Sequence, residues 1–294
     1  MEVTVFAPAT VSNLGPGFDV LGLAVEGPGD RVTARLADTL TLEAPAHVPS
    51  DPHQNTAGVA AREVLRRTGA AGVHLRLHKG MSVGTGLGSS SASAVAAAVA
   101  TNHLLGGPLS KAELLECAVE GEALVSGRHA DNVAPCLYGG LVLVRHDLEV
   151  LQLPLPEMTV VTVTPEFELP TKRAREVLPE RVPLASMVRT ASDIASLVHA
   201  CHTGDLSLVG RALHDEVVTP VRAALIPGGP QALEAARAAG AFAASISGAG
   251  PTCFALTTDH ADAIGQAMVQ AFAGSGLRAT ARHCRLPQPG ARVL

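Results

Sequence analysis

A glycine- and serine-rich segment at residues 84–93, GTGLGSSSAS, constrains the fold of this chain more than any other feature. An alternating apolar stretch at residues 73–78, typical of a half-buried strand, comes before it, and an alanine-rich stretch at residues 90–105, typical of a helix, comes after it. Glycines let backbone N–H groups converge on an anion, and the first turn of a helix adds the positive end of its dipole. This order of elements favours a phosphate-binding loop over a flexible turn.

The loop differs from the two commonest phosphate-binding motifs. A Walker A loop needs a lysine that this segment lacks, and in the dinucleotide motif GxGxxG the third glycine comes one residue later than Gly88. The three consecutive serines at residues 89–91 offer hydroxyl groups to phosphate oxygens or to Mg²⁺.

The composition excludes several functional classes. Of the 294 residues 47% are hydrophobic and 17% are charged, which suits folded domains and not a disordered chain. Only 2% are aromatic, and the net charge is −5. Because proteins that bind single-stranded nucleic acid use basic grooves with stacking aromatic side chains, we expect no nucleic-acid partner.

The pattern of apolar residues also argues against a membrane protein. The longest apolar runs, such as residues 94–100, are far shorter than the roughly 18 residues of a spanning helix. The N-terminal residues lack the basic and apolar regions of a signal peptide, and the five cysteines show no CxxC spacing. We therefore expect a soluble protein in the reducing cytoplasm.

Strand and helix patterns mix in both halves of the chain. Asn55 is a candidate N-cap, and Ser110 with Glu113 forms a capping box. Alternation predicts strands at residues 3–7, 31–36, 40–43, 73–78, 141–145, 159–164, 252–257 and 279–285. Periodicity predicts helices at residues 56–68, 90–105, 111–125, 184–202, 206–217, 230–239 and 261–273. This mixture, without strict βαβ alternation, predicts an α+β protein of two domains with a boundary near residue 155.

Two further loop-like segments belong with the first one. They are APATVSNLGPGFD at residues 7–19 and SISGAGPT at residues 245–252, and each alone is typical of a plain turn. In this order and spacing, the three segments resemble the signature motifs of the GHMP small-molecule kinases, and most of all the branch that acts on L-homoserine. The resemblance extends to residues 121–127, 129–135, 171–179, 220–222 and 290–294, and so spans essentially the whole chain.

The resemblance implies both a fold and a reaction. The fold is a ribosomal-protein-S5-like, ATP-binding domain at residues 1–155 and a ferredoxin-like domain at residues 156–294, with the active site in the cleft between them. The reaction is ATP-dependent phosphorylation of the side-chain hydroxyl of L-homoserine, in threonine biosynthesis. A homodimer is usual for such relatives, so we expect one here.

The resemblance also assigns residues to ATP and its metal ion. Ser90 and Glu122 would hold Mg²⁺, a pairing of hydroxyl and carboxylate that suits this ion. The residues expected to bind ATP are Ser82, Val83, Gly84, Thr85, Gly86, Leu87, Gly88, Ser89, Ser90, Ser91 and Ala92, with Asn55 in the segment where relatives contact the base.

The expected substrate is a zwitterion with a hydroxyl group, and matched positions supply a partner for each part. Arg175 and Arg222 would bind the carboxylate, because a guanidinium forks onto two oxygens, and Asp19 would bind the ammonium. Asn13 and His129 match further substrate-side positions.

Phosphoryl transfer demands positioning and charge neutralisation more than a covalent catalyst. By resemblance Asn132 would orient the hydroxyl, with Thr171 and Arg175 near the transferred phosphate. Whether the neighbouring Asp131 acts as a base stays open, and we expect no strong base.

Two alternative functions stay open. The first is another GHMP kinase acting on a mevalonate- or shikimate-type alcohol, in which Asp19 would have no ammonium to bind. The second is a catalytically inactive GHMP-fold binding protein, although such proteins typically lose the metal and phosphate groups that Ser90, Glu122 and the glycine loop retain here.

Overall fold

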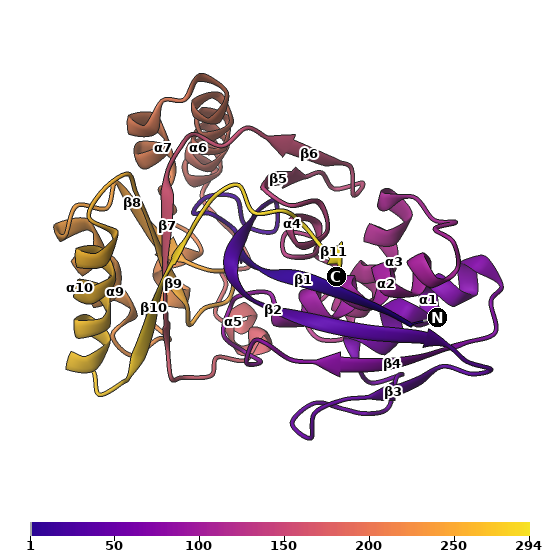
Figure 1. Ribbon diagram of the computed structural model, residues 1–294. Helices are drawn as coiled ribbons and strands as arrows, with labels where there is room; N and C mark the ends of the chain where they lie inside the picture. The colour runs from indigo at the N-terminus through magenta and orange to yellow at the C-terminus, as the bar shows by residue number, and fades with distance from the viewer. Residues whose placement is uncertain (1) are drawn as a thin grey trace.

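The chain folds into two β-sheets that lie side by side, each packed against helices (Figure 1). The computed structural model describes residues 2–294. The α+β class expected from the sequence is confirmed, since strands and helices occur in both halves of the chain.

The first sheet has seven strands in the order β11-β1-β2-β4-β3, with β5 pairing to β2 and β6 pairing to β5. All these pairings are antiparallel except that of β3 with β4. The strands are β1 (Glu2–Ser12), β2 (Leu21–Leu36), β3 (Thr41–Glu43), β4 (Val73–His78), β5 (Leu141–Val144), β6 (Val150–Leu153) and β11 (Arg292–Val293).

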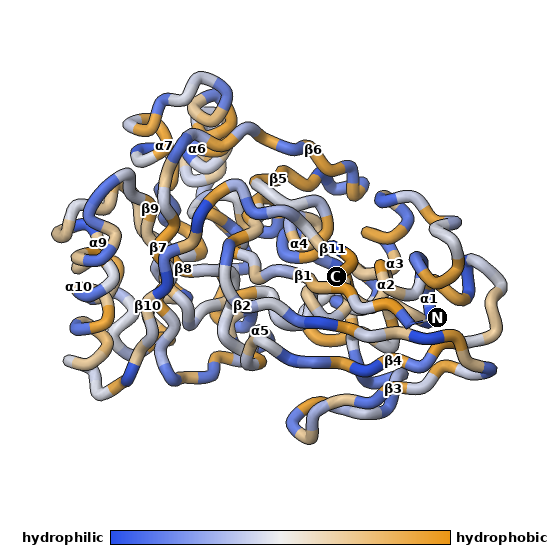
Figure 2. The backbone as a smooth tube through the Cα atoms, in the orientation of Figure 1, coloured by the Kyte–Doolittle hydropathy of each residue, from blue (hydrophilic) through white to orange (hydrophobic). Residues whose placement is uncertain are grey.

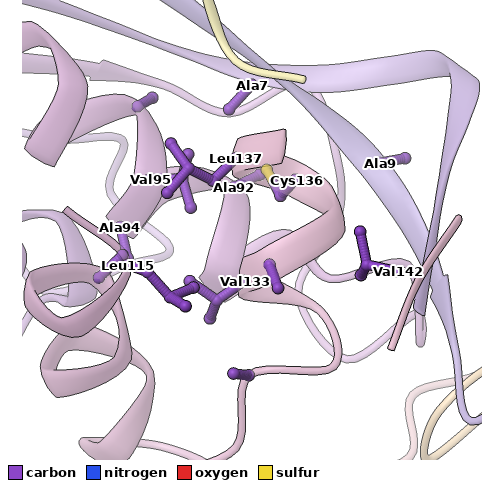
Figure 3. Close-up of a cluster of buried hydrophobic side chains, with 14 of the residues drawn as sticks. Ala7, Ala9, Ala92, Ala94, Val95, Leu115, Val133, Cys136, Leu137 and Val142 are labelled. Carbon is purple, nitrogen blue, oxygen red and sulfur yellow. The ribbon is translucent and has the colours of Figure 1, made fainter. Parts of the chain in front are cut away.

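Four helices pack with this sheet: α1 (Thr56–Thr68), α2 (Ser89–Leu104), α3 (Lys111–Ala123) and α4 (Val133–Tyr138). α2 contacts each of the other three helices as well as strands β1 and β2. Small side chains such as Ala92 and Ala94 are fully buried and let these neighbours approach closely (Figure 3). The first residues of α2, which end the glycine loop, are therefore anchored by the core behind them.

The second sheet has the order β10-β7-β9-β8, and all its pairings are antiparallel. Its strands are β7 (Thr159–Pro165), β8 (Ala243–Ile246), β9 (Cys253–Thr257) and β10 (Ala279–Cys284), packed against α9 (Gly229–Ala238) and α10 (Ala261–Gly274). In chain order this is a 4-1-3-2 sheet with split βαβ connections, the ferredoxin-like arrangement. Hydrophobic and hydrophilic residues alternate along α10 (Figure 2), and it buries Ile264, Met268 and Phe272.

Four more helices follow β7 in the chain: α5 (Thr171–Glu176), α6 (Leu184–Thr203), α7 (Leu206–Ala212) and α8 (Thr219–Ala223). α6 and α7 pack together, and their Leu197, Ala200 and Val209 join the hydrophobic core of the first sheet. The last strand, β11, likewise pairs with β1. The halves are thus interlocked, and a boundary near residue 155 stays a prediction.

Local sequence signals predicted several elements correctly. β4 and α1 have the bounds that were expected, and the Asn55 side chain accepts a hydrogen bond from the Ala57 N–H at 3.0 Å. The capping box of Ser110 and Glu113 opens α3 as expected.

Three expectations about the ends of elements were wrong. The strand expected at residues 31–36 begins at Leu21, because residues 22–25 pair with the end of β1. Residues 7–12, which we expected to lie in a loop, continue β1 to Ser12, because they pair with β2 beyond a register shift at Pro8. The helix expected at residues 206–217 ends at Ala212, because the Asp215 carboxylate accepts backbone N–H groups of residues 217–219 and starts a new turn. The short elements α4, α5, α8, β6, β8 and β11 were not predicted.

Among residues 2–294, no helix is both long and apolar enough to cross a membrane.

Candidate active site

The glycine loop leads into α2 without a side-chain cap. Gly84, Gly86 and Gly88 all have positive φ, between 69° and 78°, a region that glycine enters without steric cost. Gly88 is the N-cap of α2 and its absent side chain makes no capping bond. The first N–H groups of α2 therefore remain for an anion, as in other phosphate-binding helix termini.

The other side of the glycine loop is held by the second half of the chain. The Thr252 hydroxyl donates to the Thr85 carbonyl at 2.6 Å, and the Ser247 hydroxyl donates to the Gly86 carbonyl at 2.6 Å. With these carbonyls turned toward residues 247–252, the third signature segment fixes the shape of the loop.

A buried carboxylate stands beside the start of α2. Glu122, on α3, is 5% exposed, and its oxygens accept hydrogen bonds from the hydroxyls of Ser90 at 3.0 Å and Ser91 at 2.8 Å. Ser126 donates to the same carboxylate. A carboxylate ringed by hydroxyls next to a phosphate-type loop is a donor set that fits Mg²⁺, which takes few protein ligands and keeps waters.

A carboxylate–guanidinium pair joins the first half of the chain to the second. Arg175 donates two hydrogen bonds to Asp19, Nη2 to Oδ1 at 3.0 Å and Nη1 to Oδ2 at 3.2 Å, and His129 Nδ1 lies 3.1 Å from Asp19 Oδ2. Burial raises the pKa of Asp19, but hydrogen bonds from His129 and Arg175 outweigh it, so that the net pKa lies below its ordinary value. Asp19 is therefore an anion at neutral pH.

A second guanidinium lies behind the first. Arg222 is 2% exposed and donates to the carbonyls of Ala174 at 3.0 Å and Gly248 at 3.1 Å. Burial, and then the charge of Arg175, lower its pKa to about 10, so it stays charged at neutral pH. The Phe18 ring faces both cations, 5.5 Å from the Arg175 guanidinium and 5.0 Å from that of Arg222.

Two hydrogen bonds fix the orientation of the Asn132 amide. Its Oδ1 accepts from the Thr10 hydroxyl at 2.7 Å, and its Nδ2 donates to the Ser12 hydroxyl at 2.9 Å. The preceding residue, Asp131, is 5% exposed, and burial followed by the charge of Asp19 raises its pKa to about 6.

These groups surround one cavity of about 300 Å³. It is lined from both halves of the chain by most of the predicted site residues: Asn13, Asp19, Val83, Gly84, Thr85, Gly86, Gly88, Ser89, Ser90, Glu122, His129, Asn132, Thr171, Arg175 and Arg222.

The remaining predicted ATP-binding residues lie outside this cavity. Ser91 and Ala92 are fully buried, and Ser82 and Leu87 line a neighbouring surface hollow. The Asn55 side chain is occupied by its capping bond and by a bond from its Nδ2 to the Pro49 carbonyl at 2.7 Å.

Several residues of the site were missed from the sequence. Ser126, Lys172 and Ala249 line the cavity. The Phe18 ring packs against the Arg175 guanidinium, and the Thr10 hydroxyl donates to the Asn132 amide. Phe18 and Thr10 lie inside the first signature segment and could have been found there. Ser126 reaches Glu122 from one helical turn further along, a spacing that a search for serines near Glu122 would detect.

Comparisons with known proteins agree with this geometry. The family model for the N-terminal domain of GHMP kinases matches residues 55–140, and that for the C-terminal domain matches residues 197–274. A homoserine kinase of Arabidopsis thaliana is 44% identical, covering 100% of this chain and 85% of that protein. One of Pyrococcus furiosus is 41% identical, covering 94% of each.

A solved structure is similar over the same length. The crystal structure of homoserine kinase from Cytophaga hutchinsonii superposes with a TM-score of 0.94 at 42% identity, covering 100% of this chain and 97% of that one. The two domain models match in order, and full-length relatives exceed 40% identity. This chain therefore belongs to the GHMP kinase family.

Proposed function

We propose that this chain transfers the γ-phosphoryl group of ATP to the side-chain hydroxyl of L-homoserine, giving O-phospho-L-homoserine. One observation carries the proposal: partners for both charges of a zwitterion, Asp19 and the guanidinium of Arg175, line the same cavity as the phosphate-type loop. The homoserine kinases that resemble the chain over its full length support the same substrate.

ATP would lie with its phosphates on the glycine loop and the first turn of α2. Ser90 and Glu122 would hold Mg²⁺ there, displacing the hydrogen bond of 3.0 Å between them. When bound, the ion would neutralise negative charge on the phosphates. In this proposal Ser126 keeps the Glu122 carboxylate in place.

L-homoserine would replace the contact between Asp19 and Arg175. Its ammonium would face Asp19, and its carboxylate would face Arg175 and Arg222. His129, which already contacts Asp19, would lie beside the ammonium with Asn13, whose Oδ1 accepts the Asp19 N–H at 3.3 Å.

The substrate hydroxyl would be oriented by Asn132, whose amide is fixed by Thr10 and Ser12. Thr171, at the start of α5, lines the same cavity and would approach the transferred phosphoryl group together with Arg175. Catalysis in this arrangement comes from alignment and charge, without a strong base.

Release of ADP measured over a panel of L-homoserine, mevalonate, galactose and shikimate tests the proposal. We expect activity with L-homoserine alone. Activity restricted to another alcohol would favour the mevalonate- or shikimate-type alternative, and activity with none would favour an inactive binding protein. Mevalonate and shikimate carry no ammonium group for the Asp19 carboxylate to bind, so Asp19 is the feature that argues against the first alternative.

The homodimer and the cytoplasmic location stay predictions. Sedimentation velocity of the purified chain tests the first of them directly.

A further inference from the structure

A buried ion pair lies behind the glycine loop, outside the cavity. Lys79 and Asp30 contact each other, with side chains 4% and 0% exposed. We propose that this pair is a positioning device for the nucleotide phosphates, which joins the two ends of the glycine loop and fixes the first turn of α2. The inference rests on the proposed binding of ATP to this loop and assigns it two residues that would not touch ATP.

The use of lysine at this position is unusual for the chain. Of its 22 lysines and arginines only Lys79, Lys111 and Lys172 are lysines, so cations are otherwise supplied by arginine. An ammonium is compact and donates in three directions, whereas a guanidinium is a planar fork. Acceptors in several directions surround Lys79 Nζ, an arrangement that suits an ammonium.

Asp30 joins the beginning of the loop to its end. Its Oδ1 accepts the Gly80 N–H at 3.0 Å, just before the loop, and its Oδ2 accepts the Ser93 hydroxyl at 2.6 Å, just after it. Asp30 itself lies on β2, where it pairs with Ala7 of β1. The central strands of the first sheet thus hold both ends of the loop through one carboxylate.

Lys79 adds the contact to the helix terminus. Its Nζ donates to the Ser89 carbonyl at 2.9 Å, the Ser89 hydroxyl at 2.5 Å and the Ser93 hydroxyl at 3.0 Å, in addition to Asp30. These acceptors use all three N–H groups of the ammonium. Lys79 therefore has no donor left for a phosphate and acts on the nucleotide only through Ser89 and the loop.

The pair compensates for a feature of the loop itself. Residues 82–88 contain three glycines at positive φ, and Gly88 gives α2 no side-chain cap. Ordering such a segment costs about 1–2 kcal/mol per residue, a cost that falls on nucleotide binding if the free loop is disordered. By fixing both ends beforehand, the pair shifts that cost from binding to folding.

Burial of the pair argues for this role over a purely stabilising one. Two buried charges lose hydration that their attraction only partly restores, so a hydrophobic pair of similar volume is often as stable. Burial lowers the pKa of Lys79, and Asp30 opposes that shift. What a hydrophobic pair lacks is the set of directed hydrogen bonds to Gly80, Ser89 and Ser93.

Three variants of the full chain test the proposal: Lys79→Met, the charge-free double variant Lys79→Met/Asp30→Asn, and the control Lys111→Met. Lys111 is exposed and lies over the Tyr138 ring at 5.1 Å. Calorimetry gives the affinity for Mg²⁺ with a non-hydrolysable ATP analogue, kinetics give KM for each substrate, and a melting curve without ligands gives stability.

We expect Lys79→Met to weaken nucleotide affinity about tenfold or more, the effect usual for residues that orient the groups holding a ligand. KM for L-homoserine should stay within about twofold of the wild type, and Lys111→Met should match the wild type in every measurement. The double variant should regain melting temperature, because no unpaired charge stays buried, while its nucleotide affinity stays low.

Two outcomes overturn the inference. Nucleotide affinity that is unchanged in Lys79→Met shows that the pair does not position the loop. Affinity that recovers together with stability in the double variant shows that the pair is merely structural. Failure of the proposed function looks different: the wild type then binds the analogue, with the same dependence on Lys79, but does not phosphorylate L-homoserine. A wild type that binds no analogue overturns both.

Discussion

Arg175 and Asp19 meet end on where they line the cavity, joined through the two Nη atoms by hydrogen bonds of 3.0 and 3.2 Å. Each is the counter-charge that one end of an amino acid needs, so the contact between them has the same charge pattern as the proposed substrate. The Arg175 Nε, by contrast, is buried and has no hydrogen-bond partner among the described residues. The two Nη groups, and not Nε, are therefore the donors that a substrate carboxylate would take over from Asp19.

Asp19→Asn should therefore raise KM for L-homoserine about 10- to 100-fold, the loss typical of one charge-assisted hydrogen bond, and leave KM for ATP within about twofold. Steady-state kinetics with each substrate varied in turn measure both values. Asp147→Asn, in the exposed pair with Arg145, is the matched control and should change neither. An equal rise in both KM values would mean that Asp19 shapes the cleft as a whole.

Glu122→Gln should lower kcat/KM about a hundredfold or more and raise the Mg²⁺ concentration needed for half-maximal rate. The amide keeps the size of the side chain but removes the charge that three serine hydroxyls surround. Glu120→Gln, two residues earlier in α3 and paired with Arg128 at the surface, is the control. If the Mg²⁺ dependence of Glu122→Gln equals that of the wild type, Glu122 is not a metal ligand.

The stabilising contribution of Asp131 should fall as the pH rises, whereas that of a carboxylate with a lowered pKa rises. Its folded pKa, about 6, lies above the ordinary value of 3.8, so between these two pH values the native state holds a proton that the unfolded chain has released. The contribution of Asp131 to the free energy of unfolding is thus fully present below about pH 4. It is lost as the pH rises to about 6, by about 3 kcal/mol for a shift of about two pKa units.

Asp131→Asn removes this loss. We expect it to gain stability relative to the wild type as pH rises from about 4 to about 7, measured by urea unfolding at both pH values. The difference between the two proteins isolates Asp131 from Asp19, His129 and Glu122, whose charges also act on it. Parallel stability curves would contradict the buried, proton-holding state.

Asn132→Ala should lower kcat more than Asp131→Ala, because the amide that Thr10 and Ser12 hold in place would orient the substrate hydroxyl. Single-turnover phosphorylation with both substrates saturating separates this step from binding. The reverse order, in folded variants, would identify Asp131 as a base and overturn the role given to Asn132.

Ser110→Ala should cost about 1 kcal/mol of stability without changing either KM. The residue accepts the Glu113 N–H at 3.3 Å at the start of α3, at the end of the helix opposite Glu122. Denaturant unfolding and kinetics on the same sample provide the two readouts. A change in Mg²⁺ dependence would show that fraying of α3 reaches Glu122.

Signals confined to a few neighbouring residues were predicted well. The Asn55 cap, the capping box of Ser110 and the alternation of residues 73–78 depend on contacts within one turn or one strand, so the sequence pattern contains them. The glycine loop was found for the same reason, since its glycines and the start of α2 are adjacent.

Contacts between distant segments could not be predicted in this way. Lys79 meets Asp30 across 49 positions, and Thr252 meets Thr85 across 167. No periodicity marks such pairs, because each is created by the packing of two strands or of the two halves. The resemblance to a family supplied Asp19 and Arg175, but neither their direct contact nor the Phe18 ring against them.

The hydrogen bonds from Thr252 and Ser247 to the glycine loop limit how the molecule can open. A rigid rotation that separated the two sheets would have to break both bonds or deform the glycine loop. Val125, after α3, lines the same cavity and is 53% exposed, so this edge of the cavity lies open to solvent. Any movement of the two halves apart is therefore coupled to the shape of the glycine loop.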